Sequence, residues 1–130
     1  MIQTQKKIFR ILTGFFMFFW LVIGGLSLLA LVIDTGATYE ANQIFDIRLT
    51  ALISVVGAFV FYKMYSFKKI GRNLFVPMLI INELYYWYFW EPYDIDDQAY
   101  WADLIFGLDY FTSGLLIALM YLTNMKKEFQ

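Results

Sequence analysis

Two carboxyl side chains lie inside stretches of this chain that otherwise have the length and apolar character of membrane spans. Glu83 falls within residues 72–90, and Asp109 falls within residues 101–122. An ionisable group at hydrocarbon depth is costly, so a membrane protein usually keeps one that has a partner or a function. A carboxyl group kept protonated by burial could relay protons, or bind a cation or an amine. These two acids are therefore the first candidates for a functional site.

Three further polar side chains could complete a network with these acids. Arg48 precedes most of the second apolar run, Asn82 adjoins Glu83, and Ser113 follows Asp109 by four residues. Counted from the expected outer ends of their spans, both acids lie about 10 Å deep at the rise of an α-helix. Arg48 could pair with one or both acids and hold three helices in register, which would make the network structural. Alternatively, the acids relay protons or bind a cation, or a shifted span boundary places Asp109 at the membrane surface.

Several kinds of chemistry are excluded or disfavoured by what the chain lacks. It contains no cysteine and no histidine. Disulfide bonds, thiol catalysis and thiolate metal sites are therefore excluded, and haem, zinc and copper sites and Ser-His-acid triads are disfavoured. The acidic segment with Asp94, Asp96 and Asp97 lacks the glycine and terminal glutamate of an EF-hand loop. We therefore expect no enzymatic activity, no cofactor and no metal site.

The composition requires that most of the chain lies in lipid. Of 130 residues, 61% are hydrophobic and 16% are charged, and a soluble domain of this size could not bury so much apolar surface. Each of four apolar runs approaches or exceeds the roughly 20 residues that a helix needs to cross the hydrocarbon core. These runs cover about residues 11–33, 47–66, 74–90 and 101–122. The sequence predicts one all-α membrane domain over residues 1–130, with four transmembrane helices in an antiparallel up-down bundle.

The second apolar run carries a row of small residues. Ala51, Ser54 and Ala58 fall on one helical face, and Ser54 with Ala58 forms a small-xxx-small pair. Small residues let helix backbones approach closely in membranes, so a neighbouring helix is expected at this face.

Basic residues gather on one side of the expected membrane. Arg48 is on the other side, whereas nine basic residues share the first: Lys6, Lys7, Arg10, Lys63, Lys68, Lys69, Arg72, Lys126 and Lys127. The positive-inside rule makes that side cytoplasmic, with both termini in the cytoplasm. A cleaved signal peptide is less consistent with the first run, which is longer than the roughly 7–15 apolar residues of such signals.

Aromatic residues crowd the opposite, outer ends of the third and fourth spans. Tyr86, Trp87, Trp90 and Trp101 belong to this group, which we call the outer aromatic mouth. Such rings suit the headgroup region and could form a plain interfacial belt. The other interpretation is a vestibule that receives a ligand or partner, since aromatic residues are enriched at recognition surfaces.

The chain ends in a segment that contains Tyr121, Thr123, Lys127 and Phe129, and Phe61-Tyr62 is followed by Phe67-Lys68-Lys69. In these features the C-terminal half resembles an uncharacterised family of small bacterial four-span membrane proteins. Its members close with a Tyr-x-x-Ser-x-Arg-Val-Lys-x-x-Phe-like tail, relative to which Phe129 falls one residue early. The resemblance implies a multi-pass protein of the inner (cytoplasmic) membrane and no particular activity.

Two functions remain open at this stage. The first is a non-enzymatic accessory subunit or oligomeric membrane component that recognises a partner or ligand through its outer aromatic and acidic face. The second is an oligomeric pore or a proton- or cation-coupled transporter that uses the intramembrane carboxylates. The expected partners are the lipid bilayer and either further copies of the chain or a larger membrane complex, and no nucleic acid is expected.

Overall fold

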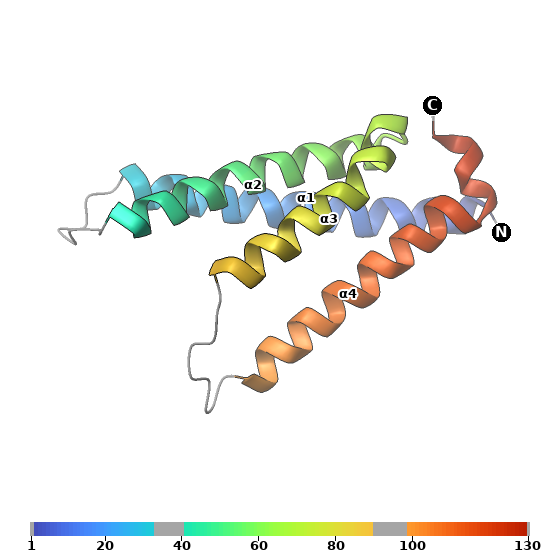
Figure 1. Cartoon of the computed structure of the whole chain (residues 1–130). Coiled ribbons are helices and arrows are strands. Elements are labelled where there is room, and N and C mark those ends of the chain that lie inside the picture. The colour runs from blue at the N-terminus through green and yellow to red at the C-terminus, as the bar shows by residue number, and fades with distance from the viewer. Residues whose placement is uncertain (1, 33–40, 90–98, 130) are drawn as a thin grey trace.

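Four α-helices and a short C-terminal 3-10 helix make up the computed structural model, which describes residues 2–32, 41–89 and 99–129 (Figure 1). Side chains are described for residues 2–30, 32, 44–85, 107–123 and 125–129. The elements are α1 (Ile2–Val32), α2 (Ala41–Tyr65), α3 (Lys69–Phe89), α4 (Ala99–Leu122) and η1 (Asn124–Glu128). The prediction of an all-α chain with four helices is confirmed.

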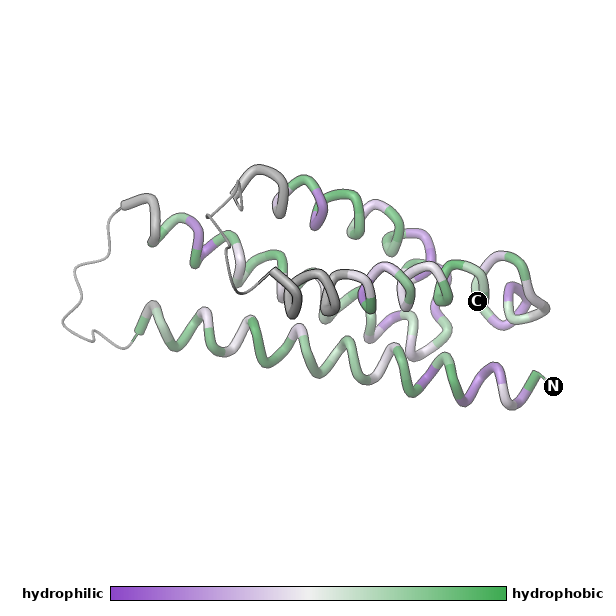
Figure 2. The backbone as a smooth tube through the Cα atoms, turned by 90° about the horizontal axis from the view of Figure 1, so that it is seen from below, coloured by the Kyte–Doolittle hydropathy of each residue, from purple (hydrophilic) through white to green (hydrophobic). Residues whose placement is uncertain are grey.

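Within the described residues, two segments are long and apolar enough to cross a membrane. They cover Ile2–Ala30 in α1 and Ile44–Tyr65 in α2, and Gly107–Leu122 in α4 is a shorter apolar helix. In Figure 2, α1 is hydrophobic over most of its length and carries hydrophilic residues near its N-terminal end. The helix begins at Ile2. The basic lead, residues 2–10 with Lys6, Lys7 and Arg10, is therefore helical as well.

The first two helices form the closest pair in the fold. They lie side by side and run in opposite directions (Figure 1). Ala51, Ser54 and Ala58 of α2 are all buried, and a Cβ added at Gly24 of α1 would lie 3.0 Å from the Cβ of Ser54. The prediction that a helix packs against this row of small residues is therefore confirmed.

A tight turn joins α2 to α3 and fixes the end of the fold that holds both termini. The amide of Phe67 donates to the carbonyl of Met64 over 2.8 Å, and the amide of Lys68 donates to that of Lys63 over 2.8 Å. This double closure is a Schellman cap, whose C′ residue is usually glycine. Phe67 occupies that position with φ of 52°, at a conformational cost of roughly 1–2 kcal/mol. Its ring packs in the core, which offsets that cost.

The core lies at this same end. The largest fully buried side chains include Phe9, Met64, Phe75, Leu116 and Met125, which come from α1, α2, α3, α4 and η1 respectively. We call this the basic end, because it holds the start of α1 with Lys6, the α2–α3 turn with Lys68 and η1 with Lys126. Toward its own N-terminal end, α4 diverges from α1 and α2 in Figure 1. The helices α1 and α2 stay in contact toward the opposite end, where a Cβ on Gly24 would meet Ser54, whereas α4 separates from them there (Figure 1).

Candidate functional site

The shorter of two described side-chain hydrogen bonds between α3 and α4 lies away from the core. The hydroxyl of Tyr110 donates to the Oε2 of Glu83 over 2.7 Å, a length typical of a strong bond to a carboxylate. Glu83 is partly buried, whereas Tyr110 is 52% exposed. A phenol and a carboxyl group are therefore joined between two helices, on a face that the described part of the chain leaves largely uncovered.

The other predicted acid is next to this contact. Asp109 precedes Tyr110 in α4, is partly buried, and lies within range of the charge of Glu83. Ser113 is buried and follows Asp109 by about one helical turn, so the two share one face. Glu83 and Asp109 are thus brought to the same region, and Ser113 lies about one helical turn further along α4.

Asn82 is placed beside this region but on another part of α3. It is partly buried, and consecutive residues of a helix point about 100° apart. Asn82 therefore cannot share the direction in which Glu83 meets Tyr110.

Arg48 is not bonded to either acid. Among the described side chains, the one ion pair joins Lys6 and Glu128, and Arg48 of α2 is exposed. One polar contact of α2 with α3 joins the hydroxyls of Thr50 and Tyr85, 2.6 Å apart. Thr50 follows Arg48 by two positions, which is about 200° around the helix. Arg48 therefore points away from the helix that carries Glu83.

Two hydroxyl groups in this region were not among the predicted site residues. Tyr85 links α3 to α2, and Tyr110 links α4 to α3. The available signal was that each Tyr places a polar tip within an apolar run, where an O–H group needs a partner. That signal identifies the donor and says nothing of its acceptor.

The outer aromatic mouth lies outside the described side chains. Tyr86 and Trp87 belong to the last turns of α3, and Trp101 belongs to the first turn of α4. Trp90 lies outside the described residues. The choice between an interfacial belt and a binding vestibule therefore stays a prediction.

A second set of polar contacts ties η1 to the helices at the basic end. The hydroxyl of Tyr121 donates to the carbonyl of Arg72 over 3.0 Å, and the Nη1 of Arg72 donates to the carbonyl of Lys126 over 3.3 Å. The guanidinium of Arg72 lies 5.6 Å from the ring centre of Phe129, within the range of a cation–π contact. Because these contacts join structural elements to one another, we assign them to folding.

The chemistry available between α3 and α4 is that of a hydrogen-bonded acid. A phenol bonded to a carboxylate, with a second carboxyl group nearby, can hold a proton or a cation. Among the described side chains, no group of three or more Asp and Glu residues is arranged to hold a metal ion.

The fold and this site together define a four-helix protein with at least two helices suited to a membrane and one acidic contact between helices. Comparison with known protein families, with curated proteins and with solved structures finds no match. The resemblance of the C-terminal half to small bacterial four-span proteins therefore stays a prediction.

Proposed function

We propose that this chain is a multi-pass protein of the inner membrane that crosses it four times and has both termini in the cytoplasm. In that membrane it acts without catalysis, as an accessory subunit or as an oligomer that recognises a partner through its outer face. The long apolar helices α1 and α2 support membrane insertion. So do the large apolar side chains that α4 turns outward, including Leu108 and Phe111, which are 58% and 70% exposed.

The orientation follows from the position of the positive charges. The end of the fold that holds both termini also holds the start of α1, the α2–α3 turn and η1 (Figure 1). These elements carry Lys6, Lys68 and Lys126 respectively. Lys and Arg are retained on the cytoplasmic side. A four-span path returns the chain to that side.

One observation carries the proposal of a partner. The hydrogen bond between Tyr110 and Glu83 is exposed, although it lies within helices whose surroundings would be hydrocarbon. Lipid cannot satisfy a polar pair, so polar groups at membrane depth normally face protein or a water-filled cavity. A helix from a second copy of the chain, or from another membrane protein, would supply that cover.

The first experiment measures mass and proximity. Because the chain has no cysteine, a single cysteine carrying a photoreactive benzophenone can be placed at Phe111 or, as the control, at Phe15. Both rings are exposed, at 70% and 62%, but Phe111 adjoins the polar pair and Phe15 lies on α1. Light-scattering mass in mild detergent should exceed that of one chain. Phe111→Cys should cross-link to protein and Phe15→Cys should not.

Two results would contradict this proposal. One is a monomeric mass in several mild detergents, with no stoichiometric co-purifying protein. The other is equal protein cross-linking from Phe111→Cys and Phe15→Cys, which would show that the face near the polar pair is no different from an ordinary lipid-facing surface.

A second function is favoured by the chemistry of the same contact. Glu83, hydrogen-bonded by Tyr110 and near Asp109, could hold a proton or cation in an oligomeric pore or coupled transporter. Purified protein in liposomes should then carry protons or cations. Glu83→Gln should abolish that flux, and Glu128→Gln, which removes a carboxylate at the basic end, should not. Absence of flux from the unaltered protein excludes this alternative.

A further inference from the structure

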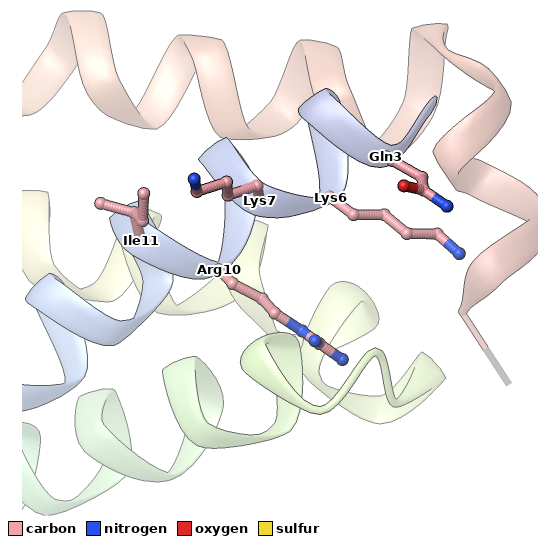
Figure 3. A pocket seen from close by; sticks show the side chains of 5 residues that line it. All are labelled: Gln3, Lys6, Lys7, Arg10 and Ile11. Carbon is pink, nitrogen blue, oxygen red and sulfur yellow. The ribbon is translucent and has the colours of Figure 1, made fainter. Parts of the chain in front are cut away.

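An open cavity of about 400 Å³ lies at the basic end, along the first three turns of α1 (Figure 3). Its lining consists of Gln3, Lys6, Lys7, Arg10 and Ile11. Three of these five side chains are cations and one is a neutral amide that can donate hydrogen bonds. Such a lining is suited to an anion with several acceptor oxygens.

One carboxylate faces these cations. Glu128 of η1 pairs with Lys6 at 2.6 Å, so the charge of Lys6 is largely compensated. Among the described side chains, Lys7 and Arg10 have no acidic partner. The cavity therefore keeps two uncompensated positive charges.

Arg10 is held in place by aromatic rings. Its guanidinium lies 5.2 Å from the ring centre of Phe67 and 5.8 Å from that of Tyr65. Phe67 is itself stacked on the buried Phe9, with ring centres 5.5 Å apart. A cation resting on ring faces is attracted by the π electrons and does not spend its N–H donors. The guanidinium is thus positioned while its donors stay available.

An apolar strip continues from the cavity along the same face of α1. Ile11, Phe15, Phe18 and Val22 follow one another at steps of four, three and four residues, the spacing of one helical face. Each of these side chains is exposed, Phe15 and Phe18 by 62% and 65%. From Ile11 to Val22 the helix rises about 16 Å, close to half of the roughly 30 Å hydrocarbon core. The strip therefore matches the length of one leaflet.

We propose that this face of α1 binds one anionic phospholipid. Its phosphate lies among Gln3, Lys7 and Arg10, and one acyl chain lies along the strip from Ile11 to Val22. A free phosphate ion would use the cations alone, whereas a phospholipid uses the charges and the adjoining strip together. The site rests on the proposed insertion of α1 with its basic end at the cytoplasmic surface. It does not depend on whether the chain assembles with a partner.

The test compares lipid retention by native mass spectrometry. Protein is equilibrated with equimolar phosphatidylglycerol and phosphatidylcholine in mixed micelles. The unaltered chain should retain phosphatidylglycerol preferentially. Lys7→Gln/Arg10→Gln should weaken that retention roughly 25-fold, because each basic residue near an anionic lipid surface strengthens association roughly fivefold. The control Lys68→Gln/Lys69→Gln removes the same charge from exposed positions at the same end and should change retention less than twofold.

Three further measurements keep the proposal falsifiable. Lys7→Gln alone, which leaves the Arg10 contacts intact, should lower retention about fivefold, so a folding defect of the double variant would not decide the outcome. Phe15→Ser/Phe18→Ser should lower retention of phosphatidylglycerol while leaving the helix content unchanged. Equimolar inorganic phosphate should not displace the lipid.

The proposal is overturned if both lipids are retained equally, if the two charge variants lose the same amount, or if inorganic phosphate displaces the lipid. The oligomeric mass is measured separately in the same samples. A failed lipid test with an intact oligomer would therefore leave the proposed function standing, and the reverse result would leave the lipid site standing.

Discussion

Replacing Phe9 by alanine removes a side chain that packs against two other aromatic rings in the core at the basic end. Phe9 is fully buried. Its ring stacks on Phe67 with centres 5.5 Å apart and meets Phe129 edge-on at 5.6 Å, and those two rings lie 5.5 Å from each other. The three rings come from α1, the α2–α3 turn and the segment after η1. The substitution therefore uncouples parts of the chain that are distant in sequence.

The expected loss of stability follows from that burial. Truncating a buried Phe to Ala costs about 3–5 kcal/mol through lost contacts and the cavity left behind. Each aromatic pair adds roughly 0.5–1.5 kcal/mol beyond area burial, but much of this is already contained in the first figure. We therefore expect a loss of about 4 kcal/mol in the free energy of unfolding.

The matched control lies on the same helix. Phe15 is 62% exposed, and in a membrane such a ring exchanges contacts with lipid for contacts with lipid when the protein unfolds within the bilayer. Phe15→Ala should therefore cost less than about 1 kcal/mol, the size of a surface substitution.

Unfolding by a rising fraction of SDS in mixed micelles, followed by circular dichroism, measures both variants. The midpoint of Phe9→Ala should fall well below that of the unaltered protein, and the midpoint of Phe15→Ala should remain close to it. Equal midpoints for the two variants would refute the assignment of the core to the basic end.

Three further substitutions test other contacts in the same assay. Gly71→Ala places a Cβ 2.5 Å from a backbone nitrogen of α2 and should cost about 1–3 kcal/mol in the free energy of unfolding by overpacking. The control Gly25→Ala, whose added Cβ has no atom within 4 Å, should be neutral or stabilising. Equal effects of the two substitutions would contradict the close approach of α2 to Gly71. Tyr110→Phe removes the hydrogen bond to Glu83 and should cost about 0.6 kcal/mol and at most about 1.7 kcal/mol, the average and the maximum for hydrogen bonds between membrane helices. A loss above that maximum would contradict the assignment of a single hydrogen bond to this hydroxyl. Lys6→Gln breaks an ion pair whose side chains are 34% and 33% exposed and should cost at most about 1 kcal/mol, less again in high salt; a larger, salt-independent loss would contradict it.

The helices could be predicted because their signal is local. Runs such as residues 47–66 are predominantly apolar along their whole length, and polar or charged segments separate the runs from one another. The predicted second run, residues 47–66, lies within α2 (Ala41–Tyr65) except for its last residue. The first helix starts earlier than its apolar run because Phe9, within the basic lead, is buried in the core. Helical spacing places it there.

The polar partners could not be predicted in the same way. Sequence places Glu83 and Asp109 at similar depth, but depth does not say how each helix is rotated about its axis. Rotation is decided by packing, which turns Arg48 away from α3 and sets the Tyr110 hydroxyl against Glu83. The expected depth of a charged group in the membrane was therefore an insufficient guide to its partner.

The sequence by itself determined the class of fold, the small-residue face of α2 and the two acids within apolar runs, because apolar length and helical spacing are properties of short segments. The tertiary structure alone decided that the core lies at the basic end, that Glu83 is bonded to Tyr110, and that the other helices leave exposed the face of α1 that carries Lys7, Arg10 and the apolar strip. These features depend on how helices distant in sequence are rotated and tilted against one another, and that depends on the contacts of the whole chain.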